Sequence, residues 1–462
     1  MENTPQLQTN ISDLLRSRSM GAKLIVVCTL ALLMMIPAFI VNGLVSERVQ
    51  RAEEVKREIG SYLGGKQTFL GPVLIVPYSA TEYVNSDRAG KIIHGFYFAS
   101  PLLASSQVIA RTEERRRSLF KVPIYQAELR MNSEFDLAAA PSSLPDNAQL
   151  EWNQAEILVG VSDARGASSD ATITISGKSM ALAPAKHSFT SDGGSLGLVL
   201  FSVPAGEWAK PSAHFQAEAA LHFSGAQRIA LLCNGKTTNV QMQADWPNPG
   251  FDGGFLPLKR EITNRGFTAQ WSVPYIARGV PAEGPIGQIQ GLSSTALGVN
   301  LVEVADPYQS VTRATKFALL FIGMVFLAYF VFEVTTGKRV HPAQYILVGL
   351  AQVIFYLLLL SLSERIGFDF GFLVAGTATV LLLSLNAMWI FKSRVQGLRG
   401  FGCFGLLYLL IYVMMRLEDN ALLVGAVASF TAVAVTMYFT RNIGWYNSLS
   451  GDNNTVPPPS RS

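Results

Sequence analysis

Charged side chains are scarce in this chain. Only 15% of its 462 residues are Asp, Glu, Lys or Arg, whereas 49% are hydrophobic. The mean hydropathy of +0.28 is too high for an ordinary soluble protein of this length. The net charge of +4 is small, and much of it lies in short segments beside apolar runs. It therefore indicates membrane topology and not a nucleic-acid partner, which would require a basic face on a soluble domain.

Cysteine, histidine and the common catalytic motifs are also sparse. Cys28 and Cys403 lie in apolar runs, so Cys233 alone remains in the middle of the chain, which excludes a disulfide framework there. His214 and His222 would share one face of a strand, too far apart to bind one metal ion. The chain has no Walker A, H-E-x-x-H, G-x-S-x-G or dinucleotide-binding glycine motif. We therefore predict no metal, no cofactor, no catalytic residue and no enzyme.

Six apolar runs without a charged residue are candidates for membrane-spanning helices. Crossing a hydrocarbon core of roughly 30 Å takes about 20 helical residues. The runs cover residues 24–45, 317–332, 342–363, 370–391, 400–415 and 420–440. The first run could instead be a cleaved signal peptide. However, it is longer than a usual signal sequence core and no small-x-small cleavage site follows Pro37, so a retained anchor is favoured.

Lysine and arginine gather on one side of these runs. If the amino terminus is cytoplasmic, the cytoplasmic segments contain the basic residues that have no acidic residue beside them. These are Arg16, Arg18, Lys23, Lys338, Arg339, Lys392, Arg394, Arg399 and Arg441. In the opposite loops, arginine stands beside glutamate and aspartate. By the positive-inside rule, both termini are predicted to be cytoplasmic and residues 46–315 to lie outside the cytoplasm.

The chain between the first two runs has a different pattern. Residues 46–65, SERVQRAEEVKREIGSYLGG, are densely charged and end in a glycine pair, which predicts a polar helical stalk. From residue 66 on, short stretches such as GPVLIVPY, ATITISG and LGLVLFSV are separated by Gly, Pro, Asn and Asp. This spacing favours antiparallel strands in a sandwich.

The predicted fold class is therefore an integral membrane protein, a polytopic α-helical bundle of six transmembrane helices. A large extracytoplasmic all-β domain, an antiparallel sandwich, is inserted between helices 1 and 2. The predicted domains are a cytoplasmic tail (1–23), transmembrane helix 1 (24–45), the stalk (46–65), the β-rich domain (66–315), a five-helix transmembrane bundle (316–441) and a disordered cytoplasmic tail (442–462).

One aromatic segment of the β-rich domain is a candidate binding site. Residues 245–262, DWPNPGFDGGFLPLKREI, hold three prolines and three glycines, and Trp246, Phe251 and Phe255 lie among them. As a structural element, this segment would be a loop folded back over a sheet, with its rings at the end of the core. As a functional element, it would be a ligand or partner surface, because rigid loops that carry aromatics often are.

Polar side chains in the helical region form two further candidate groups. Gln352 and Asn386 are the most polar large side chains inside the runs, and hydrogen bonds between helices explain them adequately. Charged residues at the outer helix ends would form an interfacial collar, pairing with one another, or would be solvated loop charges. The collar candidates are Glu364, Arg365, Arg416, Glu418 and Asp419.

Several longer segments resemble the CreD family of bacterial inner-membrane proteins. They are GPVLIVPY, RRSLFKVPIYQAEL, DWPNPGFDGGFLPLKREI with GFTAQWSVPYIARG, KFALLFIGMVFLAYFVFE with HPAQYILVGLAQVIFYLLLLSLSE, and LEDNALLVG, in the family's order. The resemblance covers nearly the whole chain after the first run. It implies a protein of the bacterial inner (plasma) membrane that supports cell-envelope integrity, produced under a two-component regulatory system linked to carbon source and wall-targeting antibiotics. It supplies no catalytic residue.

Three hypotheses follow for the function. The first is a non-enzymatic stress-response protein of the envelope, whose periplasmic β domain binds an envelope protein or polysaccharide while the helices contact the lipid bilayer. The second is a transporter or lipid-handling protein that uses the carboxy-terminal bundle. A polar cavity that reaches Gln352 and Asn386 would favour the second hypothesis, and a dry bundle would count against it. The third is a membrane hydrolase with a site assembled from distant residues.

Overall fold

The protein consists of two compact units. The computed structural model describes residues 20–82, 91–117, 120–137, 143–186, 196–302, 307–416 and 421–441. One unit is Ala52–Val304, which we call the β domain. The other combines Met1–Arg51 with Ala305–Ser462, and we call it the helical unit.

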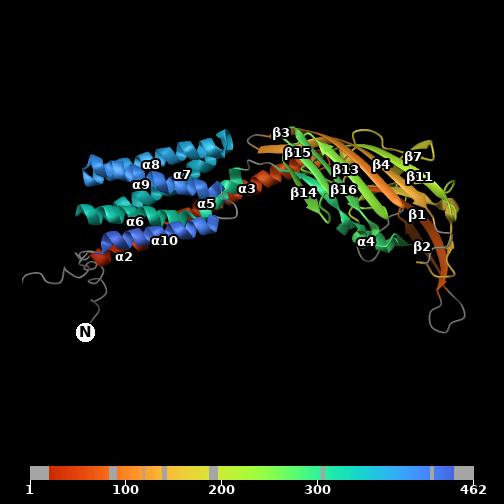
Figure 1. Cartoon of the computed structure of the whole chain (residues 1–462), viewed down its shortest axis with the longest axis horizontal. Helices are drawn as coiled ribbons and strands as arrows, with labels where there is room; N and C mark the ends of the chain where they lie inside the picture. The colour runs from red at the N-terminus through yellow and green to blue at the C-terminus, as the bar shows by residue number, and fades with distance from the viewer. Residues whose placement is uncertain are drawn as a thin grey trace, which may run out of the picture. The chain divides into compact units, whose positions relative to one another are not determined.

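The helical unit contains the apolar helices that the hydropathy pattern predicts. Its helices are α2 (Met20–Leu33), α3 (Met35–Tyr62, which continues into the β domain), α5 (Pro307–Lys316), α6 (Ala318–Thr336), α7 (Pro342–Ile366), α8 (Phe368–Phe391), α9 (Arg394–Arg416) and α10 (Ala421–Thr440). Figure 1 shows α6 to α10 side by side. Within the described ranges, six helical stretches are long and apolar enough to cross a membrane, with α2 and α3 together forming the first. The prediction of six transmembrane helices is therefore confirmed.

Several of these helices extend beyond the predicted apolar runs, among them α6 and α9. Helix α6 continues past residue 332 and includes Glu333, and α9 begins six residues before residue 400 and includes Arg399. The predicted runs were too short there because they stopped at the nearest charged residue. A helix, in contrast, is held by backbone hydrogen bonds and continues through a charge that has a partner or faces water.

The eight-stranded sheet of the β domain is antiparallel except between β13 and β3. In spatial order its strands are β15 (Lys259–Thr263), β16 (Gly266–Val273), β13 (Thr237–Ala244), β3 (Leu103–Arg117), β4 (Phe120–Asp136), β11 (His214–Ala226), β7 (Thr172–Ile175) and β8 (Lys178–Ala181). The long β3–β4 hairpin forms its centre.

The ten-stranded sheet forms the second layer and is antiparallel except between β1 and β12. Its main path is β14 (Pro249–Gly253), β18 (Leu297–Leu301), β12 (Arg228–Leu231), β1 (Gln67–Glu82), β6 (Glu156–Val161), β10 (Val199–Pro204) and β9 (Ala183–Pro184). Three more strands lie off this path, namely β2 (Lys91–Ala99), β5 (Gln149–Leu150) and β17 (Glu283–Pro285).

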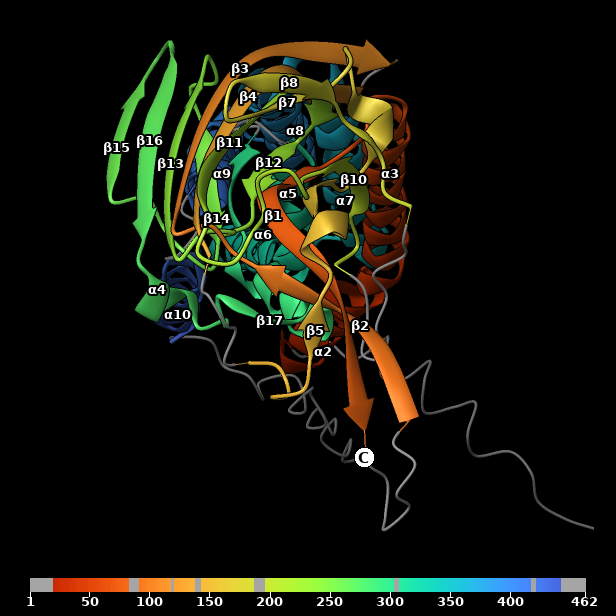
Figure 2. The same cartoon turned by 90° about the vertical axis from the view of Figure 1, so that its right-hand side faces the viewer.

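The main core lies between the two sheets. Along β11, Phe215, Leu221 and Phe223 are buried, and the residues between buried positions are mostly exposed, as the pleat of a strand with one buried face requires. Phe223 contacts Phe69 of β1 edge to face, at 5.4 Å between ring centroids. Figure 2 shows the eight-stranded sheet curving around the other layer. The predicted sandwich is confirmed.

The two sheets differ in what covers their outer faces. The ten-stranded sheet has a second apolar cluster on its outer side, where Phe98 and Leu158 pack with Ile289 and Leu292 of the 3₁₀ segment Ile286–Thr295. On the eight-stranded sheet, the outward side chains of the central strands are mostly polar and exposed, although Ile109 of β3 is apolar. This second face is therefore the one available to a soluble ligand.

The chain enters the β domain through a tight turn after α3. The helix ends at Tyr62, and Gly64 and Gly65 follow with φ of 84° and 61°, a region that favours glycine. The buried Gln67 side chain then donates to the carbonyls of Gly64 and Asp163, both at 2.9 Å. This amide holds the end of the stalk helix against the first strand.

Candidate functional site

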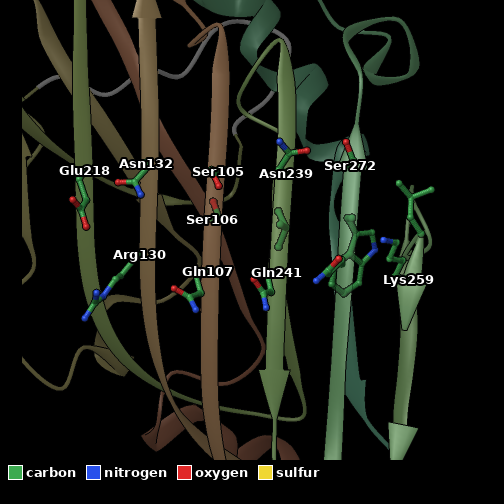
Figure 3. A pocket seen from close by; sticks show the side chains of 14 residues that line it. Ser105, Ser106, Gln107, Arg130, Asn132, Glu218, Asn239, Gln241, Lys259 and Ser272 are labelled. Carbon is green, nitrogen blue, oxygen red and sulfur yellow. The ribbon is translucent and has the colours of Figure 1, made fainter. Parts of the chain in front are cut away.

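The outward face of the eight-stranded sheet contains a hollow of about 560 Å³. Figure 3 shows that polar side chains cross its strands in two rows. The first row consists of Ser272, Asn239, Ser105, Asn132 and Glu218, which are paired across neighbouring strands. The second row consists of Lys259, Gln270, Gln241, Gln107 and Arg130.

The sheet fixes the spacing of these rows. Neighbouring strands lie about 4.8 Å apart, so a row across five strands is roughly 19 Å long. The two rows are two residues apart along each strand, which is about 7 Å. The surface therefore presents polar groups at a regular spacing, as an extended ligand with repeating units would require.

The hollow is rich in amide side chains. Five amide side chains line it, namely Gln107, Asn132, Asn239, Gln241 and Gln270. Within the described ranges, none of the five makes a side-chain hydrogen bond to another protein group. Each amide can donate two hydrogen bonds and accept through its oxygen. Arg130 and Lys259 add positive charge at the two ends of the second row.

Of the three aromatic candidates, Trp246 is buried in the core of the β domain, and Phe251 and Phe255 are half-buried against it. Trp246 is 9% exposed, and its indole N–H donates to the carbonyl of Val302 at 3.1 Å. Phe251 packs edge-on against Trp271 at 5.9 Å between ring centroids, and Phe255 packs against the same core. The rings therefore pack at the edge of the core, as the structural alternative predicted. The prediction of a loop was wrong at residues 249–253, because this stretch pairs with β18 as strand β14.

Cys233 has the opposite properties of a catalytic thiol. Its side chain is fully buried, and the thiol donates to the carbonyl of Thr295 at 3.2 Å. Burial raises the pKa of Cys233 to about 11, so the thiol stays protonated at neutral pH. No cluster of three or more His, Cys, Asp or Glu suited to a metal ion occurs among the residues that the structure describes.

A buried arginine beside Cys233 is a residue that the sequence did not single out. Arg278 is 3% exposed and makes no ion pair with a described carboxylate. Its guanidinium donates to four oxygens instead, the carbonyls of Asn234 (3.2 Å), Gly235 (2.7 Å) and Pro281 (2.5 Å) and the hydroxyl of Ser100 (3.1 Å). Desolvation lowers the pKa of Arg278. The side chain therefore joins three loops of the β domain as a structural element.

The two intramembrane candidates have different environments. Asn386 accepts a hydrogen bond from the Tyr329 hydroxyl at 3.2 Å, and its amide donates to Gln344 at 3.4 Å. Asn386 thus makes the hydrogen bonds between helices that the sequence suggested. Gln352 is 3% exposed, and its Nε2 is buried without a partner in the described part of the chain. The structure does not link Gln352 to Asn386 by a hydrogen bond.

A buried ion pair in the helical unit lies outside the predicted candidates. Glu333 of α6 is 1% exposed and pairs with Lys23 of α2. Its carboxylate also accepts from the backbone N–H of Val340 at 3.0 Å and from the Tyr345 hydroxyl at 3.2 Å. This cluster joins α2, α6 and α7. A hint existed in the sequence, since Glu333 directly follows an apolar run and Lys23 directly precedes another.

Two of the collar candidates have polar partners outside the collar set in the described part of the chain. Arg416 pairs with Asp369, whose carboxylate also accepts from the Tyr412 hydroxyl at 3.0 Å. Glu364 accepts from the Tyr308 hydroxyl at 3.1 Å. Arg416 and Glu364 therefore have partners that the sequence did not indicate.

The structure gives less information on the other three collar candidates. Arg365 is exposed at the end of α7. Glu418 and Asp419 lie outside the described residues.

Comparisons with known proteins agree with the architecture. A family model described as inner membrane protein CreD matches residues 19–446. The inner membrane protein CreD of Escherichia coli strain K12 is 30% identical over 421 residues, which are 90% of this chain and 91% of that protein. A solved M1 zinc metallopeptidase from Deinococcus radiodurans overlaps at a TM-score of 0.21 and 8% identity, over 74% of this chain and 93% of that one, too weakly to support any argument. With both units included in the family match, the chain belongs to the CreD family of inner membrane proteins.

Proposed function

We propose that this protein supports the integrity of the cell envelope without catalysing a reaction, by binding an envelope polysaccharide in the hollow of the eight-stranded sheet. The observation that carries the proposal is the set of five amides on the outward face of the sheet that make no side-chain hydrogen bond with a described group. Sugar hydroxyls and acetamido groups both donate and accept hydrogen bonds, as amide side chains do. Arg130 and Lys259 suit carboxylate groups on such a polymer.

The expected affinity per repeating unit is modest. A net hydrogen bond contributes about 0.5–1.5 kcal/mol, and the binding of a free ligand also costs translational and rotational entropy. A short fragment should therefore bind weakly. A long polymer anchored in the wall should bind more tightly, because several copies of the protein can engage one strand.

The test uses full-length protein in nanodiscs and purified peptidoglycan sacculi as the polysaccharide. Gln107→Ala with Gln241→Ala removes the two central amides, and the loss of about 1–2 kcal/mol predicts roughly 5- to 30-fold weaker sedimentation with sacculi. The matched control is Gln126→Ala, an exposed amide of β4 that does not line the hollow. Equal sedimentation of the double variant and the control would refute the proposal, as would no sedimentation of the wild type. Retention of a soluble envelope protein in place of sacculi would point to a protein partner.

We propose in addition that both termini are cytoplasmic and that residues 46–315 are periplasmic. The basic residues Lys338 and Lys392 support this orientation, because they lie where α6 meets α7 and α8 meets α9. Alkaline phosphatase fused after Gly177 should be active, and the same reporter fused after Ser393 should be inactive. The reverse pattern would overturn the orientation and with it the access of the hollow to the wall.

Transport of a polar solute through the helical unit receives less support. Asn386 is already engaged by Tyr329 and Gln344, and neither Asn386 nor Gln352 lines the apolar groove described below. A polar path would need such side chains to face water. The proposal therefore assigns recognition to the β domain.

A further inference from the structure

An apolar groove of about 670 Å³ lies between α6, α9 and α10. Aliphatic side chains from all three helices line most of it, among them Leu327, Val331, Leu406, Leu410, Ala432 and Val435. Small residues on α10, including Ala428 and Ala432, leave space that a larger side chain would fill. All three helices are long and apolar enough to span a bilayer, so lipid is the solvent around this groove.

One end of the groove is polar. Thr335 near the end of α6 lies there with Gln396 and Arg399 in the first two turns of α9. Gln396 is 8% exposed, and its Oε1 is buried without a hydrogen-bond donor in the described part of the chain. The Arg399 side chain is exposed and makes no ion pair or hydrogen bond with a described group. The groove thus ends in a free positive charge and an unpaired acceptor.

The length and width of the groove indicate which kind of ligand fits it. Gln396 to Leu410 covers roughly 21 Å along α9, more than half the thickness of a hydrocarbon core of about 30 Å. Over that length, a volume of about 670 Å³ corresponds to a channel roughly 6 Å wide. A partner helix with a diameter of about 10–12 Å does not fit, whereas a single extended hydrocarbon chain does.

We propose that this groove binds one acyl chain of an anionic glycerophospholipid whose headgroup also carries hydroxyl groups, as in phosphatidylglycerol. The phosphate lies against Arg399, which is free to pair with it. Gln396 lines the same end of the groove, and a turn of its side chain lets Oε1 accept from a headgroup hydroxyl, which removes the cost of a buried, unpaired acceptor. This site is independent of the polysaccharide surface, because it uses only residues of α6, α9 and α10.

The acyl part of the site is tested by filling the groove. Full-length protein in mild detergent is delipidated, and phosphatidylglycerol is titrated in and counted by native mass spectrometry. Wild type should retain one lipid. Ala432→Phe should weaken retention at least tenfold. The control Ala434→Phe places the same ring at an exposed position of α10 outside the groove and should retain lipid like wild type. Equal retention by the two variants, or none by wild type, would overturn the proposal.

The headgroup part is tested by removing the charge. Arg399→Gln should lower the preference for phosphatidylglycerol over phosphatidylethanolamine at least fivefold, whereas Arg394→Gln, an exposed arginine at the start of α9 outside the groove, should not. Because Arg399 is exposed, this variant should fold normally. No lipid preference in the wild type would refute the headgroup assignment. Displacement of the lipid by inorganic phosphate alone would show that a free anion, and not a lipid, is the ligand.

Discussion

Replacing Arg278 with Met should loosen the β domain around Cys233. The substitution keeps most of the apolar stem but leaves three carbonyls and one hydroxyl without their donor. Hydrogen bonds from a charged donor contribute about 1.5–3 kcal/mol each. The desolvation of the guanidinium, whose Nε is itself buried without a partner in the described chain, offsets part of this sum. We therefore expect a net loss of about 3 kcal/mol, which raises the population of the open form roughly a hundredfold.

The assay uses Cys233 as the reporter. Full-length protein with Cys28→Ala and Cys403→Ala contains this thiol alone. Because Cys233 is fully buried, maleimide reacts with it only when the surrounding structure opens, so the labelling rate measures that opening. Arg278→Met should label about a hundred times faster than the parent at pH 7.5.

Two further variants make this prediction refutable. Arg265→Met alters an exposed arginine in the same domain and should leave the labelling rate unchanged. Arg278→Lys retains a charged donor, but an ammonium has three donors in place of the guanidinium's five, so its rate should be intermediate. If Arg278→Met labelled at the parent rate, the cost of burying the guanidinium would cancel its hydrogen bonds, and its assignment as a structural element would be wrong.

Three other predictions follow from the described contacts. Lys23→Met should lower the melting temperature of the detergent-solubilised protein, because it leaves Glu333 buried without a cation at a cost of about 3–5 kcal/mol. Adding Glu333→Leu to the same chain should restore part of the lost stability, and no recovery would count against the pair. The stability of the β domain should fall as pH rises from about 8.5 to about 11, since the Cys233 thiol ionises first in the unfolded chain, and Cys233→Ala should flatten this dependence in chemical denaturation. Phe251→Ala should destabilise the β domain by about 1–3 kcal/mol, less than for a fully buried ring, without weakening retention on sacculi. Weaker retention by the folded variant would identify this ring as a binding residue.

The helical part of the fold could be predicted because its signal is local. The free energy of transfer from water to lipid adds along a continuous stretch, so each apolar run identifies its own helix without reference to the rest of the chain. The same property explains the error at Glu333. A predicted run ends at its first charge, but this carboxylate can be buried because it pairs with Lys23. Lys23 lies 310 residues away in the sequence. Composition within a window contains no information about such a partner.

In the β domain, local sequence predicts which residues of the proposed binding surface face outward but not how they align across strands. Alternation along a strand predicts which of its residues are polar and outward, so Gln107 or Gln241 could have been placed on an exposed face from local sequence. Their alignment depends on the register between β3 and β13, two parallel strands separated by about 130 residues of chain. The aromatic segment shows the same limit, because its sequence left open whether the rings lie at the end of the core or on a partner surface, and the pairing of β14 with β18 places Phe251 against the core.

The sequence by itself therefore determined which parts of the chain suit lipid and which suit water, and with them the six transmembrane helices and the sandwich. It could do so because hydropathy and strand alternation act over a few neighbouring residues. The resemblance of longer segments indicated the family. Only the tertiary structure decided which amides form the two rows, which carbonyls Arg278 meets and where three helices leave a groove with Arg399 at its end. Those features arise from contacts between residues far apart in the chain, and their positions depend on how all the elements pack together.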